Sequence, residues 1–453
     1  MSQCKLTFYG GVGRVTGSNF LLEGENWKLL VDCGLAQGDR FCDEDNKKAF
    51  PYEPETINVL CVTHAHIDHI GRIPKLVHDG FRGKIYSTPE TKSLAKLLLA
   101  DALNVMKNEN TKGAVLLYTE ADIEHTFELW ETISYHKETP IGGFCTMYLK
   151  NAGHVLGSSI IEITVNGTKI AFTGDLGNTP ALLMKDTEPV TDAQYLVMDS
   201  VYGDRNHEPP KDRTEKLKNI LRSTILRGGA ALIPAFSLER TQVILYEINN
   251  FIENHEIPSV PVYLDSPLAI RITEIYQQFS ADFNARASAE IASGDDIFTF
   301  PKLVSVVNGR DSQKISRMSG PKIIIAGSGM STGGRIVHHE LEYLSDAKST
   351  IIIVGYQAAG SLGRELEDGA RSVKIGEQTV PVRAEIQMIS GYSSHKDSDH
   401  LVEFASLALP KAKKIFVVMG EPKSSLFLVQ RLRDYLGASA LMPEIGKPYI
   451  LEF

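Results

Sequence analysis

Residues 63–69 read THAHIDH and place metal-binding side chains at His64, His66, Asp68 and His69. The chain has only 13 histidines in 453 residues, so three of them within six positions form a dense cluster. Imidazole and carboxylate groups are the usual ligands of catalytic zinc, which activates a water molecule for hydrolysis. We therefore interpret the stretch as the centre of a metal site rather than as a chance cluster on a solvated loop.

The residues around this cluster predict how it is held. INVLCVTHAH (57–66) is rich in β-branched and apolar residues and predicts a buried strand, and IDHIGRIPKL (67–76) predicts the start of a helix. Side chains two positions apart on an extended strand end point to the same side, as expected for His64 and His66. Asp68 and His69 should face the same pocket where the chain turns, held by a rigid scaffold.

Other strand ends offer further groups for this site. His154 in NAGHVLGSS and Asp175 in TGDLGN both follow strand-like runs, and a carboxylate can bridge two cations about 3.5–4 Å apart. Asp32 in LLVDCG could fix a ligand histidine through that ring's other N–H. Each residue alone is weak evidence, because a lone histidine is often a core residue. The stretch MDSVYGDRNH adds Asp199, Tyr202, Arg205 and His207.

The composition limits the class of protein. Hydrophobic residues make up 43% of the chain and charged residues 23%, as in soluble globular proteins. No apolar run approaches the ~18 residues of a membrane span, and MSQCKLTFYGG has no signal region, so we expect a cytoplasmic protein with no membrane partner. With a net charge of −9, any nucleic-acid surface must concentrate its basic residues in a groove. The cysteines are odd in number and lack a CxxC pair, which favours reduced thiols at Cys4, Cys33, Cys42, Cys61 and Cys145.

The pattern along the chain predicts a discontinuous first domain (1–205 and 381–453) interrupted by a second domain (206–380). The first part predicts an antiparallel meander, a hairpin at Asn166-Gly167, and helices over 91–109 and 120–133, the latter with a Thr119–Asp122 cap. From 206 to 380, strands and helices alternate, which predicts a parallel sheet covered by helices. Residues 381–453 return to shorter strands with two helices.

Taken in order, THAHIDH, NAGHVLGSS and FTGDLGN resemble the metallo-β-lactamase superfamily. DSVYGDRNH, IPAFSLERTQ, IAGSGMSTGGR, GYQAAGSLG and GYSSHKD resemble its β-CASP branch, and within it the cleavage-and-polyadenylation-factor type of ribonuclease. The resemblance covers nearly the whole chain. It implies an α/β fold, in which a metallo-β-lactamase αββα sandwich carries an inserted β-CASP parallel-sheet domain, with substrate entering between them and no RNA-binding domain ahead of the sandwich.

The same resemblance implies a zinc-dependent ribonuclease that cleaves RNA, expected to be single-stranded, and it leaves a homodimer open. It assigns a first zinc ion to three histidines, a second to the end of the THAHIDH stretch, and a bridging role to one aspartate. Asp68 is counted among the catalytic residues as well, and an acid–histidine pair is implied to protonate the leaving group. The implied positions are His64, His66 and His154; Asp68 and His69; Asp175; and the pair Asp199 and His395.

One position departs from the family pattern. The family usually has a histidine in a VHGE stretch that completes the second zinc site, whereas residues 417–421 read VVMGE, with Met419 in that place. A thioether is a soft, poor ligand for a site of oxygen and nitrogen donors. We therefore expect one zinc ion to be held firmly and a second more loosely. An apolar residue stands at this position in related DNA-processing members, so a DNA substrate remains an alternative.

The glycine-rich stretch GSGMSTGGR predicts a strand-to-helix turn that could bind a phosphate. An ordinary α/β turn is the alternative, and His338 and His339 are interpreted as structural. The candidate substrate-binding residues are Ser328, Gly329, Ser331, Arg335, Arg240 and Arg364.

Two other functions stay open. A small-molecule metallo-hydrolase would share the metal motif, but the long α/β insertion argues against it. A non-catalytic scaffold subunit has Met419 as its only support.

Overall fold

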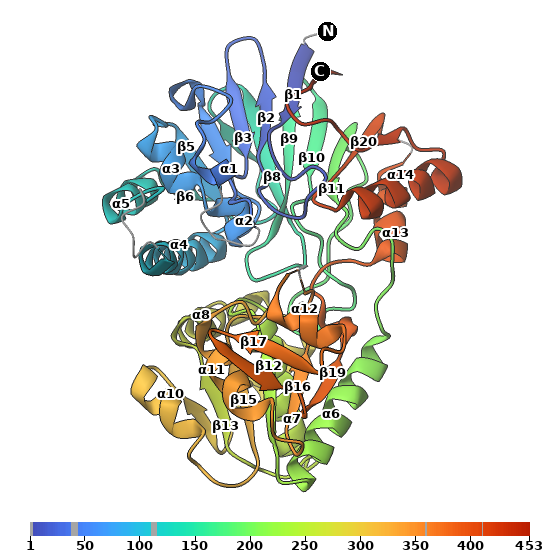
Figure 1. The fold of residues 1–453 in the computed structure, drawn as a ribbon. Coiled ribbons are helices and arrows are strands. Elements are labelled where there is room, and N and C mark those ends of the chain that lie inside the picture. The colour runs from blue at the N-terminus through green and yellow to red at the C-terminus, as the bar shows by residue number, and fades with distance from the viewer. Residues whose placement is uncertain (1–2, 38–43, 110–115, 358–359, 410) are drawn as a thin grey trace. The chain divides into compact units, whose positions relative to one another are not determined.

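The computed structural model describes residues 3–37, 44–109, 116–357, 360–409 and 411–453 (Figure 1). The chain divides into two compact units, one formed by residues 1–206 and 395–453 and the other by residues 207–394. The first boundary lies one residue from the predicted one. The second lies at 394/395 instead of 380/381, because β19 (Glu385–Met388) pairs in parallel with β16 (Thr350–Ile353) and so continues the sheet of the second unit.

Within its described residues, the first unit contains two seven-stranded sheets. In spatial order the strands of one sheet are β22 (Pro448–Glu452), β1 (Gln3–Phe8), β2 (Phe20–Glu23), β3 (Lys28–Val31), β4 (Val59–Cys61), β5 (Lys84–Ser87) and β6 (Trp130–Thr132). Those of the other are β21 (Ala440–Leu441), β20 (Lys414–Val418), β11 (Tyr195–Asp199), β10 (Thr168–Phe172), β9 (Ser159–Val165), β8 (Cys145–Asn151) and β7 (Thr139–Ile141).

Two local predictions are confirmed here. Strands β1, β2 and β3 form the antiparallel meander. Strands β9 and β10 form a hairpin whose turn residues have positive φ, 49° at Asn166 and 82° at Gly167. That backbone twist suits a two-residue hairpin loop, which explains why Asn-Gly is a strong signal.

The helices of the first unit are α1 (Glu44–Lys47), α2 (Ile67–Ile70), α3 (Ile73–His78), α4 (Pro89–Glu109), α5 (Glu120–Glu128), α13 (Ser398–Ala408) and α14 (Pro422–Leu436), with a 3₁₀ turn at Pro54–Thr56. Thr119 caps α5 in a capping box with Asp122, as predicted. The helix is shorter than the predicted 120–133, because Trp130 begins β6 beside β5 and its indole Nε1 donates to Ser87 Oγ at 2.8 Å.

Two apolar cores explain the layered arrangement of the first unit. Alternate residues of both sheets meet in one core, among them Leu6 and Phe8 from one sheet and Leu149 and Ile161 from the other. A second core lies on the opposite face of the β8–β11 sheet, where α13 and α14 cover it. Helices α2–α5 lie beside the β5–β6 end of the other sheet (Figure 1). The unit is therefore an αββα sandwich.

The described part of the second unit contains a parallel sheet of six strands, in the spatial order β14 (Leu303–Ser305), β13 (Val262–Asp265), β15 (Lys322–Ala326), β12 (Ala230–Pro234), β16 and β19. Its other elements are the hairpin β17 (Ser372–Ile375) and β18 (Gln378–Pro381), the helices α6 (Pro210–Leu226), α7 (Arg240–Glu253), α8 (Pro267–Gln278), α9 (Ala285–Ala292), α10 (Gly309–Ile315), α11 (Gly334–Tyr343) and α12 (Leu362–Glu367), and 3₁₀ turns at Ser280–Asp282 and Ser390–Tyr392.

The chain passes from β13 toward the β14 edge of this sheet, but from β15 toward the β16 side. The loops that follow β13 and β15 therefore diverge, and such a point at the carboxyl ends of parallel strands is a common ligand site.

Across the described residues, no helix is long and apolar enough to cross a membrane. The described cysteines Cys4, Cys33, Cys61 and Cys145 are buried free thiols, and Cys42 lies outside the described residues.

Candidate metal centre and active site

Every metal-ligand position implied by the sequence lies in the first unit, close to the ends of strands from both sheets. His64 and His66 follow β4, Asp68 and His69 lie on α2, His154 follows β8, and Asp175 follows β10. The turn that carries Asp68 approaches the segment after β3 so closely that a Cβ added at Gly34 would lie 1.5 Å from the Asp68 carbonyl oxygen. Only glycine therefore fits at residue 34, and this close approach fixes α2 against the strand ends.

Four of these side chains form one compact donor group. The distance from His66 Nδ1 is 3.0 Å to His64 Nε2 and 3.2 Å to His154 Nε2. From Asp175 Oδ2 the distances are 3.5 Å to His64 Nε2 and 3.6 Å to His154 Nε2. Donor atoms at ~2.0–2.1 Å from a tetrahedral zinc ion lie about 3.3 Å apart, so these four donors fit one such ion. Three imidazoles and a carboxylate thus converge as the ligands of a zinc ion do.

A second donor group uses the other carboxylate oxygen of Asp175. His69 Nε2 lies 3.5 Å from Asp175 Oδ1 and 3.8 Å from Asp68 Oδ2. His69 Nε2 and Asp175 Oδ1 are both buried and have no hydrogen-bond partner among the described residues. Buried polar atoms without a partner are costly, and a cation between them would satisfy both. Asp175 thus has one oxygen in each group, as a bridging ligand requires.

Asp32 fixes the orientation of His69, as the sequence predicts. Its Oδ2 accepts a hydrogen bond from His69 Nδ1 at 2.7 Å, which leaves Nε2 directed at Asp175. Asp32 is itself held by the backbone N–H of Thr63 at 2.8 Å, the Thr63 hydroxyl at 2.9 Å and the Ser18 hydroxyl at 3.2 Å. A carboxylate that orients a ligand histidine in this way also makes the ring more basic.

The electrostatics of the two groups suit cation binding. Burial, together with the neighbouring His69, lowers the pKa of His64 well below its usual value, so its ring is neutral and able to bind a metal. Burial also opposes a charge on His69, but Asp175, Asp32 and Asp68 outweigh it and raise the pKa of that ring. Three carboxylates that attract a proton to His69 would equally attract a cation.

Asp199 and His395 lie together at the edge of the first donor group. Asp199 ends β11, and its Oδ2 is 3.6 Å from His395 Nδ1, which is also 3.9 Å from Asp175 Oδ2. Burial raises the pKa of Asp199 to about 6. Burial opposes protonation of His395 as well, but Asp199 and Asp175 raise the pKa of its ring above the usual value. This pair can share a proton near neutral pH, as a general acid must.

One residue that the sequence analysis did not single out holds this pair in place. Lys396 is 5% exposed, and its Nζ donates to the Gly177 carbonyl at 2.9 Å and to Thr179 Oγ1 at 2.7 Å. Its backbone N–H donates to the Leu176 carbonyl at 2.8 Å, and His395 forms a β-bridge with Gly177. The segment carrying His395 is therefore attached to the loop that follows Asp175. A lysine beside a motif histidine gives no sign of burial in the sequence, so this role could not be read from it.

Met419, which stands where the family pattern has a ligand histidine, lies in the apolar core between the two sheets. It is 1% exposed, and its backbone N–H donates to the Gly11 carbonyl at 2.6 Å. A Cβ added at Gly11 would lie 2.5 Å from the Met419 sulfur, so the thioether lies against that backbone. The second donor group thus has Asp68, His69 and Asp175 as its described members.

The structure places the candidate substrate residues of the second unit in different roles. The Arg335 guanidinium donates to Asp265 Oδ1 at 2.6 Å and to the carbonyls of Val306 at 2.8 Å and Val307 at 2.7 Å. Arg364 pairs with Asp368 at 3.0 Å, and the Ser331 hydroxyl donates to Glu340. The guanidinium groups of Arg335 and Arg364 thus have partners within the protein.

The remaining members are Arg240, which is 7% exposed in the first turn of α7, and Ser328 and Gly329 in the turn after β15. Of the two histidines interpreted as structural, His339 is buried against Asp265 at 2.7 Å and His338 is exposed on α11. In the first unit, the Tyr202 ring lies 6.1 Å from that of His395, and the Arg205 guanidinium lies over Tyr202 at 5.1 Å. His207 begins the second unit.

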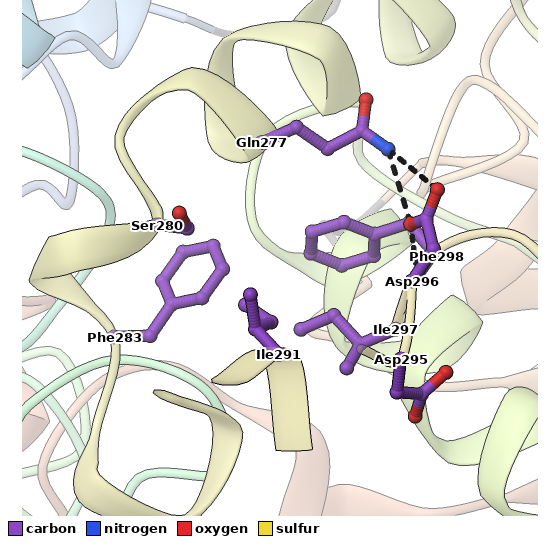
Figure 2. Close-up of a pocket in the computed structure, with 8 residues that line it drawn as sticks. All are labelled: Gln277, Ser280, Phe283, Ile291, Asp295, Asp296, Ile297 and Phe298. Carbon is purple, nitrogen blue, oxygen red and sulfur yellow. Dashed lines mark hydrogen bonds between the residues drawn. The ribbon is translucent and has the colours of Figure 1, made fainter. Parts of the chain in front are cut away.

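A cavity of about 230 Å³ lies in the second unit, between α8, α9 and the loop that follows (Figure 2). It is lined by Gln277, Ser280, Phe283, Ile291, Asp295, Asp296, Ile297 and Phe298. Gln277 Nε2 donates to Asp296 Oδ1 across it at 3.2 Å (Figure 2). None of the predicted site residues lines it, and its two carboxylates would repel a phosphate.

Comparison with known families and proteins agrees with this geometry. Family models match three stretches of the chain: the metallo-beta-lactamase superfamily at residues 12–229, the Beta-Casp domain at 241–366, and the Zn-dependent metallo-hydrolase RNA specificity domain at 379–443. The last match begins close to the predicted boundary at 380/381, although the compact second unit extends to residue 394.

Similar proteins of known sequence span the whole chain. Ribonuclease TTHA0252 of Thermus thermophilus is 33% identical over 93% of this chain and 94% of its own length. An RNase J-like protein of Methanocaldococcus jannaschii is 31% identical over 97% and 98%, and transcription termination factor FttA of Pyrococcus horikoshii is 32% identical over 97% and 70%. A crystal structure of a protein of unknown function from Enterococcus faecalis covers 99% of the chain and 100% of its own, with a TM-score of 0.57 and 13% identity, and supports the fold alone.

The sandwich and its converging donor groups define a metal-dependent hydrolase. More particularly, the chain belongs to the metallo-beta-lactamase superfamily and carries its Beta-Casp domain.

Proposed function

We propose that this protein is a zinc-dependent ribonuclease that hydrolyses phosphodiester bonds of single-stranded RNA in the cytoplasm. The observation that carries the proposal is the group of His64, His66, His154 and Asp175, whose donor atoms all lie within 4.8 Å of one another. Three imidazoles and one carboxylate are suitable ligands for zinc, and soft thiolates are not part of the group.

The residues of this chain divide the work of hydrolysis among them. His64, His66, His154 and Asp175 would hold the first ion, and Asp68, His69 and Asp175 the second. When bound, such ions lower the pKa of a water molecule and neutralise charge on a phosphate. Asp32 keeps His69 in the orientation that this arrangement needs.

Departure of the sugar oxygen requires a proton, which the Asp199–His395 pair is placed to supply. His395 Nδ1 faces the carboxylates of Asp199 and Asp175, so Nε2 is the atom that would present the proton to the leaving group. Both carboxylates stabilise the protonated ring, which keeps the acid charged near neutral pH.

Two considerations support RNA as the substrate. A family of RNA specificity domains matches residues 379–443, and two of the similar proteins carry the names ribonuclease and RNase J-like protein. The alternative of DNA rests on Met419, since the thioether packs in the apolar core where a ligand histidine is usual. For the same reason, we propose that the second zinc ion is held more weakly than the first. The homodimer stays a prediction.

One experiment tests the proposal directly. The purified protein is analysed for bound metal and incubated with end-labelled single-stranded RNA and DNA of the same sequence. We expect bound zinc and cleavage of RNA in preference to DNA, abolished by a chelator and restored by zinc. Asp192→Asn is a matched control for changes at Asp175, because Asp192 lies outside the donor groups, half exposed and paired with Lys169. Metal-loaded protein that cuts neither nucleic acid would reject the function and favour a scaffold.

A further inference from the structure

Phe236 is a large apolar residue in an unusual position, directly after β12 at the carboxyl end of the parallel sheet. Its neighbours Ala235 and Leu238 are buried at 1% and 4% exposure, whereas Phe236 is 41% exposed. Most exposed apolar residues are single and need no explanation. This one follows β12, the neighbour of β15 in the sheet, and so lies beside the point between β13 and β15 where ligands commonly bind.

Gly329 keeps the ring of Phe236 accessible, and Gly355 lies at ordinary van der Waals distance from it. A Cβ added at Gly329 would lie 2.7 Å from Cδ2 and 2.9 Å from Cε2 of the ring, and one added at Gly355 would lie 3.8 Å from Cε2. Any side chain at residue 329 would thus displace or cover the aromatic ring. The backbone of these two turns supports the ring without covering it, which suits a flat ligand that stacks.

Neutral hydroxyl groups lie in the turns near the Phe236 ring, since Ser237 follows Phe236 and Ser328 precedes Gly329 in the chain. Ser237 Oγ lies 3.3 Å from Ser266 Oγ, and Ser328 Oγ lies 3.1 Å from Thr332 Oγ1. The first pair lies close to Gly327, the residue before Ser328, because a Cβ at Gly327 would lie 3.8 Å from Ser237 Oγ and 3.9 Å from Ser266 Oγ. A hydroxyl can donate and accept, so these groups can match the polar edge of any base.

Two carboxylates close in sequence to Phe236 or to these hydroxyl groups are engaged within the second unit. Glu239 is buried and accepts a hydrogen bond from Tyr276 at 2.5 Å. Asp265 is surrounded by Arg335 at 2.6 Å, His339 at 2.7 Å and Ser312 at 2.6 Å. The nearby cation Arg240 is buried at 7% exposure in the first turn of α7, so the accessible chemistry is an aromatic face with hydroxyls, which favours an uncharged planar group over a phosphate.

We propose that Phe236 stacks on a nucleobase of the RNA substrate, with the hydroxyls of Ser237, Ser266, Ser328 and Thr332 around the edge of that base. The proposal rests on the proposed ribonuclease function and adds a residue that selects unpaired bases. Unpaired bases expose a face that an aromatic side chain can cover, whereas bases within a duplex are already stacked.

The test compares Phe236→Ala, Phe236→Trp and the wild type on single-stranded RNA and on the same RNA with abasic positions introduced one at a time. Leu226→Ala is the matched control, because it truncates another apolar side chain of the second unit that is 71% exposed. Binding is measured by fluorescence anisotropy in a His395→Ala background, which retains the ligands of both donor groups. Cleavage is measured in the metal-loaded enzyme.

We expect Phe236→Ala to weaken binding of normal RNA by roughly five- to hundredfold, the range measured when an aromatic stacking platform is truncated, and Phe236→Trp to restore it. At one abasic position the difference between wild type and Phe236→Ala should disappear. An unchanged affinity in Phe236→Ala, or an equal loss with every abasic RNA, would overturn the proposal. RNA that binds and stacks on Phe236 but is never cut would instead overturn the ribonuclease function alone.

Discussion

Site residues predicted from the sequence lie together in the metal centre of the first unit. At the carboxyl end of the parallel sheet in the second unit, the predicted residues have other roles. Every metal-ligand residue named from the sequence in the first unit joins one of two donor groups. In the second unit, Arg335 and Arg364 are paired within the protein, and the accessible group is Phe236, which lies in the IPAFSLERTQ stretch but was not among the candidate site residues. The role of a histidine and aspartate cluster is thus easier to predict from sequence than the role of a single arginine, which can pair with many kinds of group.

The physical reason lies in how easily each side chain finds a partner. Arginine has five donors and is satisfied by any nearby carboxylate or carbonyl, as Arg335 is by Asp265 and Val306. Three imidazoles and a carboxylate whose donor atoms all lie within 4.8 Å of one another have the ligand types and the spacing of a metal site. A cluster such as His64, His66 and His154 therefore implies a ligand, whereas a single arginine in a turn does not.

The largest effect should come from Asp175→Ala. This variant removes an oxygen from each donor group, so both cations lose a ligand and nuclease activity should fall beyond the ~10²–10⁴-fold that general-acid variants lose. Zinc content and RNA cleavage are measured side by side, with Asp192→Asn as the control. Retained zinc with normal cleavage would mean that the first unit is not the catalytic region.

His395→Ala and Asp199→Asn should have the next largest effect, slowing cleavage by ~10²–10⁴-fold because a proton for the leaving oxygen is no longer supplied. The three histidine ligands of the first group stay intact, so zinc content should remain close to that of the wild type. Loss of zinc in either variant would show that the pair binds metal instead of donating a proton.

Lys396→Met should lower kcat by about tenfold and leave KM for RNA nearly unchanged, because the segment carrying His395 loses its attachment to the loop after Asp175 and the acid is misplaced. Lys396→Arg, which keeps a buried donor, should recover most of the rate. An equal fall in kcat and thermal stability without recovery by arginine would indicate a purely structural role.

Arg335→Met should change stability more than activity, which separates the two regions. Asp265 is fully buried and would lose its ionic partner, while His339 and Ser312 would still donate to it. We expect the free energy of unfolding to fall by about 1.5–3 kcal/mol, the usual contribution of a hydrogen bond to a charged group. Urea denaturation measures this, and RNA cleavage by the folded variant should stay within about twofold of the wild type because Arg335 is engaged internally. A large rise in the KM for RNA would instead indicate that Arg335 binds the substrate.

The smallest effect is expected for Met419→His. The backbone of Met419 has a φ of 50°, a conformation in which histidine is found more often than most residues, so the main cost is repacking of the apolar core. If the imidazole reaches the second donor group, zinc retained after dialysis should rise toward two ions per chain, as the metal-filled site needs. Activity should improve at low zinc and converge with the wild type at saturating zinc by mass action. Equal zinc retention would show that residue 419 does not complete that group.

Much of the fold could be predicted because the local signals agreed with the global structure. Asn166-Gly167 forms its hairpin, and Asp32 contacts His69 as expected. The missed features depend on tertiary contacts. Trp130 looked helical but joins β5 as a strand, and residues 385–388 join the parallel sheet through β16. Nothing in the local sequence distinguishes buried Lys396 from a solvated lysine.

The strand pairing of the first unit has a consequence for its biosynthesis. The first strand of the chain pairs with the last, Cys4 opposite Leu451, and β20 completes the sheet beside β11 only after the whole second unit has been made. At translation rates of ~5–20 residues per second, the early strands wait tens of seconds for these partners. The β1 edge and the face later covered by α13 and α14 are therefore exposed on the ribosome, where chaperones can bind them. His395 also emerges late, so the proposed catalytic pair of Asp199 and His395 can form only when most of the chain has been made.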